Sequence, residues 1–326
     1  MNNLPMSSTE PRSGKRCATA EVRKASPSLA VLIPTLDRPD DLTIAVRTLL
    51  EQSLLPQEVI IVDQSRSDES EKQVRKLFAD ERAAKVRLKY ILDPGIASLA
   101  KARNVALDQN QCEVFLFIDD DVELEPDFIE KLLEGYEEDA EVTGISGIIT
   151  NYTPRAFTSR AWQWMFVRGP FQDERQYYYQ QAERLRDAGR IAVSRFGGGL
   201  MSFRCERTNG LRFNENLRGA SEGEDVDFCL HLPAGARLEM DPRARLVHKV
   251  SPTARKSEHW IGSLVRGNCY LYYRNWRHGW RNRIAFAWLV CGYTVLALIA
   301  SAKDRSLAPW QAFTAAVRYG KEVGSA

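Results

Sequence analysis

The sequence predicts an α/β fold in which a mostly parallel, Rossmann-like sheet is flanked by helices. Short, continuous apolar runs alternate with segments of helical period, and the connections between them are short. Two of the apolar runs end directly in aspartate, at Asp63 and Asp119. Because the carboxyl ends of parallel strands lie at one edge of such a sheet, we expect these acids to face a shared ligand-binding edge.

The first half of the chain supplies four strand–helix units. Apolar runs predict strands at 28–34, 58–63, 86–91 and 114–118. The segments that follow them predict helices at 40–53, 68–78, 97–107 and from Pro126 onward. Asp40 and Asp41 are typical of a helix N-terminus, and Pro126 is typical of a first helical turn. Strand–helix repeats with short connections indicate right-handed crossovers.

The repeating pattern stops after Thr150, and we divide the chain there. Residues 1–27 are polar and aperiodic, which predicts a disordered tail and no secretory signal. The strand–helix half covers 28–150, and a second half covers 151–255. Residues 256–326 predict a basic, aromatic and hydrophobic helical region. Within the second half, residues 236–250 predict two short strands that deliver His248.

Composition narrows the class of protein. Of the 326 residues, 44% are hydrophobic and 27% charged, which is typical of a globular protein. The net charge of +2 gives no global field that would attract nucleic acid. The six cysteines are scattered and form no CxxC pair. We therefore expect a reducing, cytoplasmic setting and no zinc site.

Three consecutive carboxylates, Asp119, Asp120 and Asp121, follow the strand predicted at 114–118. Adjacent carboxylates repel one another, and a hard divalent cation neutralises them. Mg²⁺ takes one or two protein carboxylates and leaves room for substrate phosphates. An acidic triplet alone would as readily solvate a strand end, but the position directly after a buried strand favours a metal–phosphate site.

A second group of acids, Glu222, Glu224, Asp225 and Asp227, leads into a short apolar segment. Crowding raises the pKa of at least one carboxylate, which makes Asp225 a candidate general base. Ordinary compensation of a helix dipole would give the same pattern.

Three further features of the sequence each allow two interpretations. Asp63 either accepts hydrogen bonds from a base or ribose or is a turn aspartate. Arg103 either reaches a diphosphate or is a solvated helix charge. The run Gly197–Gly199 is either a tight bend or a place where a sugar meets backbone.

These stretches, in this order, resemble the inverting family-2 glycosyltransferases with a GT-A fold. The resemblance runs from about residue 28 to residue 250 and more weakly beyond. It rests on the stretches VLIPTLDRPDDLTIAVRTLLEQS, EVIIVDQSRSD, ARNVAL, FLFIDDDVELEPDF, GGGLMSFR and EGEDVDFCLHL, with His248 downstream.

The resemblance implies a role for each matching residue. Residues 28–150 would bind the nucleotide sugar, and 151–255, with an acceptor-side insertion, would bind the acceptor and carry the base. The implied donor contacts are Thr35, Asp63, Arg103, Asp119 and Asp120, and the implied ligands of Mg²⁺ or Mn²⁺ are Asp119, Asp121 and His248. The implied catalytic base is Asp225, and the implied acceptor contacts are Gly198, Gly199, Met201 and Glu224.

Two positions depart from the family pattern. The second strand ends DQSRSD in place of an Asn-Gly-Ser-type turn, which leaves the base specificity open, and His231 occupies a place usually taken by Arg.

The implied reaction is a metal-dependent, inverting transfer of a sugar from a nucleotide-diphosphate donor to a hydroxyl group. The acceptor would be a growing glycan or a lipid-linked saccharide, as in bacterial surface-polysaccharide synthesis. A nucleotidyltransferase that makes nucleotide sugars would show a glycine-rich, basic loop after the first strand, and PTLDRPDD is not one. A non-catalytic nucleotide-sugar-binding membrane scaffold would lack the acids at 119–121 or 224–225, and both are present.

The stretch at 284–300, IAFAWLVCGYTVLALIA, contains 17 uncharged residues, slightly fewer than the roughly 20 that span a bilayer. Arginine-rich sequence with Trp276 and Trp280 precedes it. A buried helix, an in-plane membrane helix and a short span all fit this pattern. Its basic, aromatic flank favours contact of residues 256–302 with the cytoplasmic face of the inner membrane.

Overall fold

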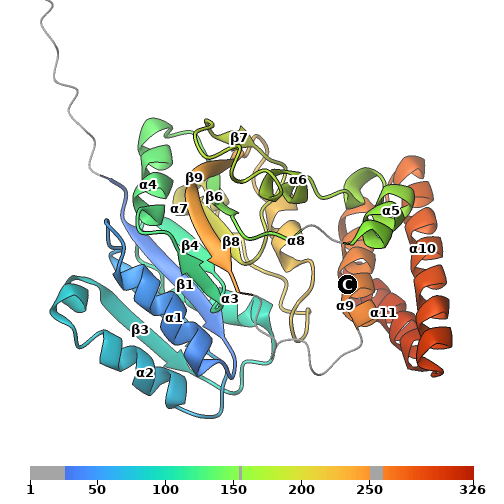
Figure 1. The fold of residues 1–326 in the computed structure, drawn as a ribbon, viewed down its shortest axis with the longest axis horizontal. Helices are drawn as coiled ribbons and strands as arrows, with labels where there is room; N and C mark the ends of the chain where they lie inside the picture. Colours follow the sequence, from blue (N-terminus) through green and yellow to red (C-terminus); the bar gives the residue numbers. More distant parts are fainter. Residues whose placement is uncertain (1–25, 154–155, 250–259) are drawn as a thin grey trace, which may run out of the picture.

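The computed structural model describes residues 26–153, 156–249 and 260–326, so the predicted tail lies outside the described residues except for Ser26 and Pro27. Strand–helix units open the fold (Figure 1). They are β1 (Leu29–Thr35) and α1 (Pro39–Leu50), β2 (Glu58–Asp63) and α2 (Glu69–Leu77), η1 (Glu81–Lys85), β3 (Arg87–Leu92) and α3 (Leu99–Gln109), then β4 (Val114–Ile118), β5 (Val122–Leu124) and α4 (Phe128–Glu138). The strands and helices predicted for this half are confirmed, with ends displaced by at most three residues.

Strands from both predicted halves belong to one sheet, in the order β3-β2-β1-β4-β8-β6-β9-β5. The strands β1 to β4 pair in parallel. Beyond β4 the pairing is mixed: β8 (Leu200–Arg204) runs antiparallel to β4 and to β6 (Gly144–Ile149). The strand β6 runs parallel to β9 (Leu238–His248). The parallel part thus ends at β4, the strand that carries the acidic triplet.

Both faces of this sheet are covered, which explains the continuous apolar runs. On β1, Leu29, Val31 and Ile33 belong to the core that includes α1 and α4. The alternate residues Ala30 and Leu32 belong to the core that includes α3 and the second half of the chain. Successive side chains of a strand point to opposite faces, so both sets of positions must be apolar.

The second half adds short elements between its strands. They are α5 (Phe157–Phe166), η2 (Gly169–Phe171), α6 (Arg175–Tyr179), β7 (Ile191–Ala192), α7 (Cys205–Thr208) and α8 (Glu224–Leu230).

The prediction of two short strands within 236–250 is wrong, because β9 is a single strand of 11 residues. It pairs with β7 at Met240 and with β5 from Leu246 to His248. Its register with β6 shifts between Met240 and Arg245. Pro242 lies in this interrupted stretch, where a residue without an N–H group is tolerated.

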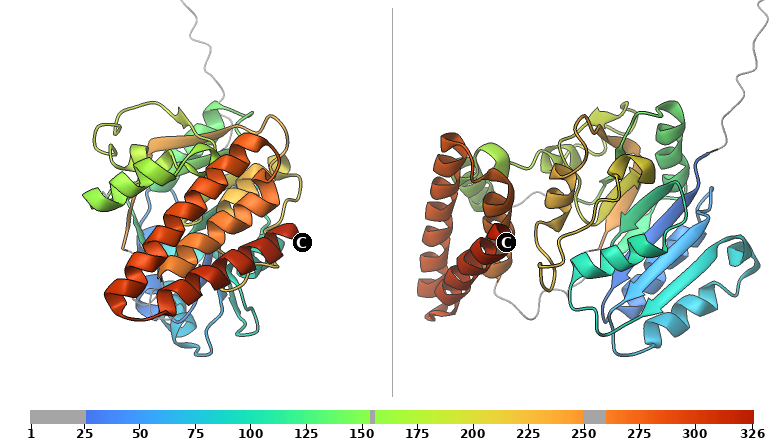
Figure 2. Two further views of the ribbon diagram at one scale, coloured as in Figure 1. Left: turned by 90° about the vertical axis from the view of Figure 1, so that its right-hand side faces the viewer. Right: turned by 180° about the vertical axis from the view of Figure 1, so that it is seen from behind.

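The chain closes with a C-terminal helical unit, by which we mean residues 260–326. It contains α9 (Trp260–Leu271), the π-helix η4 (Tyr272–Trp276), α10 (Trp280–Asp304) and α11 (Ala308–Ser325). These helices gather on one side of the molecule with α5 beside them (Figures 1 and 2). Gly320 lets α11 approach α9 closely, since a Cβ atom there would meet Cys269 and Tyr270.

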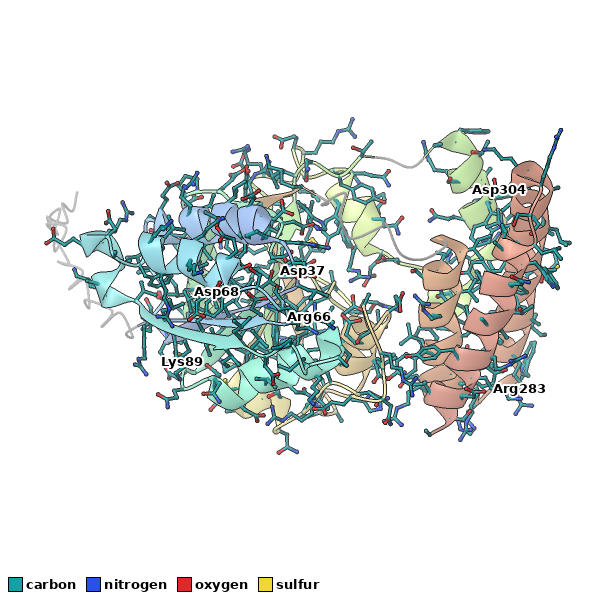
Figure 3. The ribbon with its side chains drawn as sticks, turned by 90° about the horizontal axis from the view of Figure 1, so that it is seen from below. Asp37, Arg66, Asp68, Lys89, Arg283 and Asp304 are labelled. Carbon is teal, nitrogen blue, oxygen red and sulfur yellow. The ribbon has the colours of Figure 1, made fainter. Side chains whose placement is uncertain are left out.

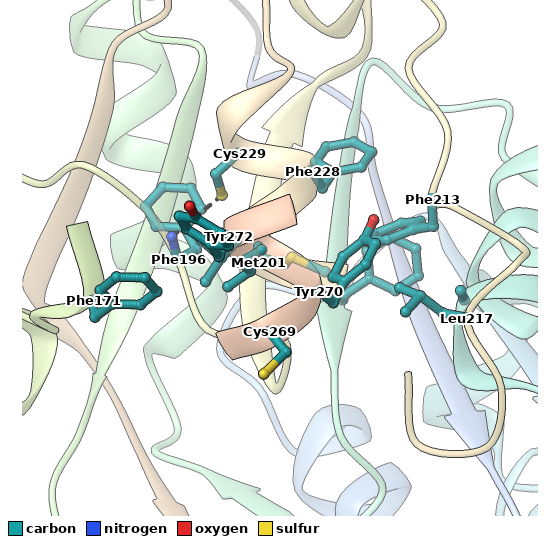
Figure 4. Packing of buried hydrophobic residues seen from close by; sticks show 14 of the residues in the cluster. Phe171, Phe196, Met201, Phe213, Leu217, Phe228, Cys229, Cys269, Tyr270 and Tyr272 are labelled. Atoms are coloured by element: carbon teal, nitrogen blue, oxygen red, sulfur yellow. Dashed lines mark hydrogen bonds between the residues drawn. The ribbon is translucent and has the colours of Figure 1, made fainter. Parts of the chain in front are cut away.

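The hydrophobic core continues from the sheet into this unit. Figure 4 shows Met201 of β8 and Phe228 of α8 in the same cluster as Cys269 and Tyr270 of α9. The helical unit is therefore packed onto the segment that carries the candidate base.

Candidate active site

An acidic group that could hold a metal ion lies past the end of β4. Asp119, Asp121 and His248 each offer one ligand atom, and these atoms lie within 4.8 Å of one another. His248 Nε2 lies 3.0 Å from Oδ1 of Asp121 and 4.0 Å from Oδ2 of Asp119. The register of β5 and β9 brings His248 opposite Val122, one residue after Asp121. Residues 127 positions apart are thereby brought together by strand pairing.

The chemistry of this group fits a divalent cation. Burial raises the pKa of Asp119, and the hydrogen bond to Asp121 raises the pKa of His248. The shift at His248 reflects the negative charge of the neighbouring carboxylates, which would also favour a bound cation. Two carboxylate oxygens suit Mg²⁺ or Mn²⁺, and an imidazole nitrogen is a usual ligand of transition metals.

The middle acid of the triplet, Asp120, points to different partners. Its Oδ2 accepts a hydrogen bond of 2.6 Å from the Thr35 hydroxyl, and its Oδ1 accepts one of 2.8 Å from Arg38. Burial raises the pKa of Asp120 to about 6, although Arg38 and Thr35 oppose that rise. Thr35 and Asp120, both assigned to the donor, are thus linked to each other, and Arg38 joins them.

Arg38 was not among the residues that the sequence singled out. It lies on the loop between β1 and α1, directly after Asp37, whose φ of 54° is in the left-handed region. Its Nη1 also lies 3.7 Å from Asp121. The available signal was the DRP triplet at 37–39, which begins two residues after the end of β1.

The candidate base Asp225 lies at the start of α8, facing the glycine run. Its Oδ2 accepts a hydrogen bond of 2.9 Å from the backbone N–H of Gly198, and its Oδ1 accepts one from the N–H of Val226. The next residue, Gly199, approaches Asp119 so closely that a Cβ atom there would collide with the carboxylate. The interpretation of the glycine run as a tight bend is confirmed, since the N–H of Leu200 donates a hydrogen bond of 3.0 Å to the carbonyl oxygen of Gly197. The bend brings the candidate base and the acidic triplet close together, and contact with a sugar stays a prediction.

A buried ion pair lies beneath the glycine run. Arg103 of α3 is paired with Glu224 of α8 and donates a hydrogen bond of 2.8 Å to the carbonyl oxygen of Gly198. Its Nη2 also lies 3.8 Å from Asp119. Burial raises the pKa of Glu224, and Arg103 opposes that effect. The interpretation of Arg103 as a solvated helix charge is wrong, since its side chain is 1% exposed.

Two residues of the metal-capable group and the candidate base line one open cavity of about 220 Å³. Its wall includes Asp119, His248, Gly199 and Asp225. The acceptor-side insertion, by which we mean residues 152–195, supplies a large part of the remaining wall, namely Tyr152, Asp173, Arg175, Gln176 and Tyr179.

Arg175 of this insertion lies beside the candidate base. Its guanidinium donates hydrogen bonds of 2.8 and 3.1 Å to the two carboxylate oxygens of Asp173. Its Nη1 lies 3.6 Å from Oδ2 of Asp225. Burial alone would lower the pKa of Arg175, but Asp225 and Asp173 raise it. The aperiodic stretch 152–195 gave no signal that pointed to this arginine in particular.

Two predicted site residues occupy less accessible positions. Asp63 is fully buried, and its carboxylate accepts hydrogen bonds from the Tyr90 hydroxyl and the N–H of Ser65. Met201 is also fully buried, because its side chain points from β8 into the hydrophobic core (Figure 4). We therefore do not retain Met201 among the acceptor contacts.

The other acids around Asp225 point to the C-terminal helical unit. Glu222 accepts a hydrogen bond of 2.6 Å from Arg266. The buried Asp227 accepts hydrogen bonds of 2.7 Å from the Tyr270 hydroxyl and 2.8 Å from Asn275. The acidic cluster therefore divides among different partners, and Asp225 is the member that lines the cavity with the metal-capable group.

Comparison with solved structures identifies the class of fold. The chain is similar to the mannosyltransferase PcManGT of Pyrobaculum calidifontis, solved with GDP-mannose and Mn²⁺: the TM-score is 0.56 at 16% identity, over 93% of this chain and 87% of that one. It is also similar to GalNAc-T7, solved with UDP, GalNAc and Mn²⁺: the TM-score is 0.53 at 15% identity, over 76% of this chain and 50% of that one. At such identities the likeness establishes the fold, which is the GT-A fold of glycosyltransferases.

Sequence comparison then gives the family. The model of glycosyl transferase family 2 matches residues 30–206, more than half of the chain, and the protein belongs to that family. The chain is also 32% identical over 99 residues to the GalNAc(5)-diNAcBac-PP-undecaprenol beta-1,3-glucosyltransferase of Campylobacter jejuni. That match covers 30% of this chain and 31% of the relative.

Proposed function

We propose that the protein transfers a sugar from a nucleotide-diphosphate donor to a hydroxyl group of a saccharide acceptor, with inversion at the anomeric carbon. The observation that carries this proposal is the single cavity lined by Asp225, Asp119 and His248. A candidate base and a metal-capable group on one cavity are what a single displacement at a sugar requires. Family membership supports the same reaction class.

Asp225 acts as the general base. Its carboxylate removes the proton from the acceptor hydroxyl while the hydroxyl oxygen attacks the anomeric carbon on the face opposite the leaving nucleotide. The Gly198 N–H and Arg175 fix the orientation of this carboxylate, at 2.9 and 3.6 Å. A fixed base and a held acceptor bring the reacting atoms within about 3–3.5 Å, which supplies much of the rate.

Asp119, Asp121 and His248 would hold the divalent cation, Mg²⁺ or Mn²⁺. When bound, such an ion stabilises negative charge on a departing diphosphate. Thr35 and Asp63, at the ends of β1 and β2, would contact the base and ribose. Both side chains already make protein hydrogen bonds, so donor binding would add to or replace the contacts with Asp120 and Tyr90.

The acceptor we propose is a lipid-linked saccharide, used at the cytoplasmic face of the inner membrane. The name of the Campylobacter jejuni relative describes an undecaprenol-linked acceptor. On the cavity wall, Tyr152 and Tyr179 present rings at 5.9 Å from each other, and aromatic faces suit the apolar faces of sugars. Gly198 and Gly199 would leave room for the acceptor beside Asp225.

Replacement of the base tests this proposal. Asp225→Asn keeps the shape of the side chain but cannot accept the proton, so donor binding should persist while transfer falls by on the order of 10³-fold. The assay combines transfer rates with a thermal-shift screen of nucleotide diphosphates, with and without Mn²⁺. Asp108→Asn is the matched control, because Asp108 is exposed near the C-terminal end of α3 and does not line the cavity. Normal transfer by Asp225→Asn would show that the base assignment is wrong.

A further inference from the structure

An apolar face on the C-terminal side of the molecule is built jointly by α5 and α10. Its members, which we call the α5–α10 face, are exposed despite being large and hydrophobic. They are Phe157 (80% exposed), Trp164 (74%), Met165 (47%), Ile284 (60%), Trp288 (46%), Val295 (41%), Leu298 (54%) and Ile299 (59%). A soluble surface rarely gathers so many such residues unless it meets a partner.

Direct contacts make the two helices one surface. The Trp288 indole N–H donates a hydrogen bond of 2.9 Å to the backbone oxygen of Met165, and its ring lies 5.3 Å from that of Phe166. The exposed residues of α10 recur at spacings of three and four, which places them in one stripe along the helix. From Ile284 to Ile299 that stripe is about 22 Å long. Figure 1 shows α5 alongside α10.

The opposite side of α10 is buried in the protein. Ala285, Phe286, Leu289, Tyr293 and Ala297 pack into the core that α9 and α11 share. The helix is long and apolar enough to cross a membrane, but 39% of its most apolar window is buried in this way. A spanning helix would have to give up these contacts, whereas a helix lying in the plane of a membrane surface keeps them.

Apart from Asp304 at the end of α10, the charged residues of α5 and α10 are all basic. Residues 157–172 and 260–303 contain no Asp or Glu, and they contribute Arg160, Arg168, Arg277, Arg281 and Arg283. Within the described ranges, the arginines at 277, 281 and 283 form no salt bridge with a carboxylate; Arg283 donates to the backbone oxygen of Arg277 at 3.2 Å, and Arg281 lies over the ring of Trp280. Figure 3 labels Arg283 near one end of α10 and Asp304 near the other. An apolar face edged by unpaired arginines and tryptophans complements an anionic lipid surface, and it does not complement a second copy of itself.

We infer that the α5–α10 face docks in the plane of an anionic bilayer, with its apolar side chains below the headgroups and its arginines on the lipid phosphates. The inference deepens the proposed function, because a lipid-linked acceptor would be met at this surface. Binding to lipid is independent of transfer, however, so the two proposals can fail separately.

Flotation of the full chain with vesicles tests the docking without any substrate. Vesicles of phosphatidylglycerol and phosphatidylcholine should carry the protein upward, and vesicles of phosphatidylcholine alone should carry much less. Ile284→Ser combined with Leu298→Ser should reduce the bound fraction more than tenfold, whereas Leu230→Ser, at another exposed leucine, should not. Arg281→Gln should lower binding roughly fivefold, and the matched Arg47→Gln should leave it unchanged.

Folding and assembly are measured in parallel. Circular dichroism should show that Ile284→Ser/Leu298→Ser keeps its helices, since both side chains are exposed. Alkaline carbonate should release the wild-type protein from the vesicles, as expected for in-plane binding. Retention after carbonate treatment would overturn the in-plane geometry. A dimer that the double serine variant converts to a monomer, without any vesicle binding, would assign the face to a second copy instead.

Discussion

The sheet edge and the C-terminal helical unit both use arginine, but they use it in opposite ways. At the sheet edge each arginine forms an ion pair with a carboxylate of the same chain. The pairs are Arg38 with Asp120, Arg103 with Glu224, and Arg175 with Asp173. In the helical unit Arg281 and Arg283 are exposed, and the segment around them contains no acid. Paired arginines hold a geometry, whereas unpaired ones are available to an external anion.

The same contrast extends to hydrophobic residues. The strands β1, β2 and β4 bury their apolar residues on both faces, whereas α10 buries one side and exposes the other. A region whose interactions are satisfied internally is suited to fixed chemistry. A region with exposed apolar side chains and arginines that lack carboxylate partners is suited to binding another molecule or surface. The predictions below test whether the two regions divide the work in this way.

The largest effect is expected at the metal-capable group. Asp121→Asn removes a charged ligand, and loss of several kcal/mol of transition-state stabilisation corresponds to a fall in transfer of on the order of 10³-fold. Thermal stabilisation by the nucleotide diphosphate should lose its dependence on Mn²⁺. Vesicle flotation should be unaffected, because the α5–α10 face is untouched. If the Mn²⁺ dependence survives in Asp121→Asn, then these residues do not hold the cation.

A smaller effect is expected at the buried ion pair. Arg103→Leu leaves Glu224 buried without its cation, which should lower the free energy of unfolding by about 3 kcal/mol. Urea denaturation measures this, and Arg103→Leu/Glu224→Leu should recover part of the loss.

The same variant has a predicted dependence on pH. Burial raises the pKa of Glu224 in the folded state, so protonated Glu224 is the form that the site accepts more readily. Without Arg103, this contribution to stability should be fully present below the ordinary pKa of 4.5 and lost as pH rises through the higher folded-state value. A stability that instead rose with pH would contradict a buried, unpaired carboxylate.

The smallest effect is expected at the junction of the two regions. Tyr270→Phe deletes the hydroxyl that donates to Asp227 and should lower the free energy of unfolding by about 1 kcal/mol. Transfer should fall through kcat with little change in KM, because Asp227 and Asp225 share α8. Tyr177→Phe serves as control, since Tyr177 is exposed. If Tyr270→Phe and Tyr177→Phe had equal kcat values, the hydrogen bond from the helical unit would have no influence on transfer.

The sequence predicts the first half of this fold well because the local pattern there is unambiguous. Runs such as 59–62 are apolar on both faces, which only a doubly covered strand requires. The single strand β9 was missed because Pro242 reads locally as a break, and only the interrupted pairing with β6 makes it tolerable. Strand pairing between distant segments cannot be read from a local pattern.

The site, like the fold, could be predicted only in part from the sequence. Carboxylates at strand ends indicate Asp119 and Asp121, and the resemblance adds His248, which the structure places with them. The sequence could not say which of the crowded acids faces the cavity, because Glu222, Glu224 and Asp227 find partners in distant helices. Arg38 and Arg175 were missed for the same reason: an arginine acquires meaning from the carboxylate it meets in three dimensions.

The bond between Asp227 and the helical unit means that this unit cannot be cut away as a detachable anchor. A chain shortened before Trp260 would lose the donors from Tyr270 and Asn275 and leave a buried carboxylate with fewer hydrogen bonds, two residues from the proposed base Asp225. To obtain a soluble, active form, substitution of the exposed apolar residues of α10 by polar ones is therefore a better route than truncation. Any shift of these helices relative to the sheet would also displace the first turn of α8, because Asp227 connects the two.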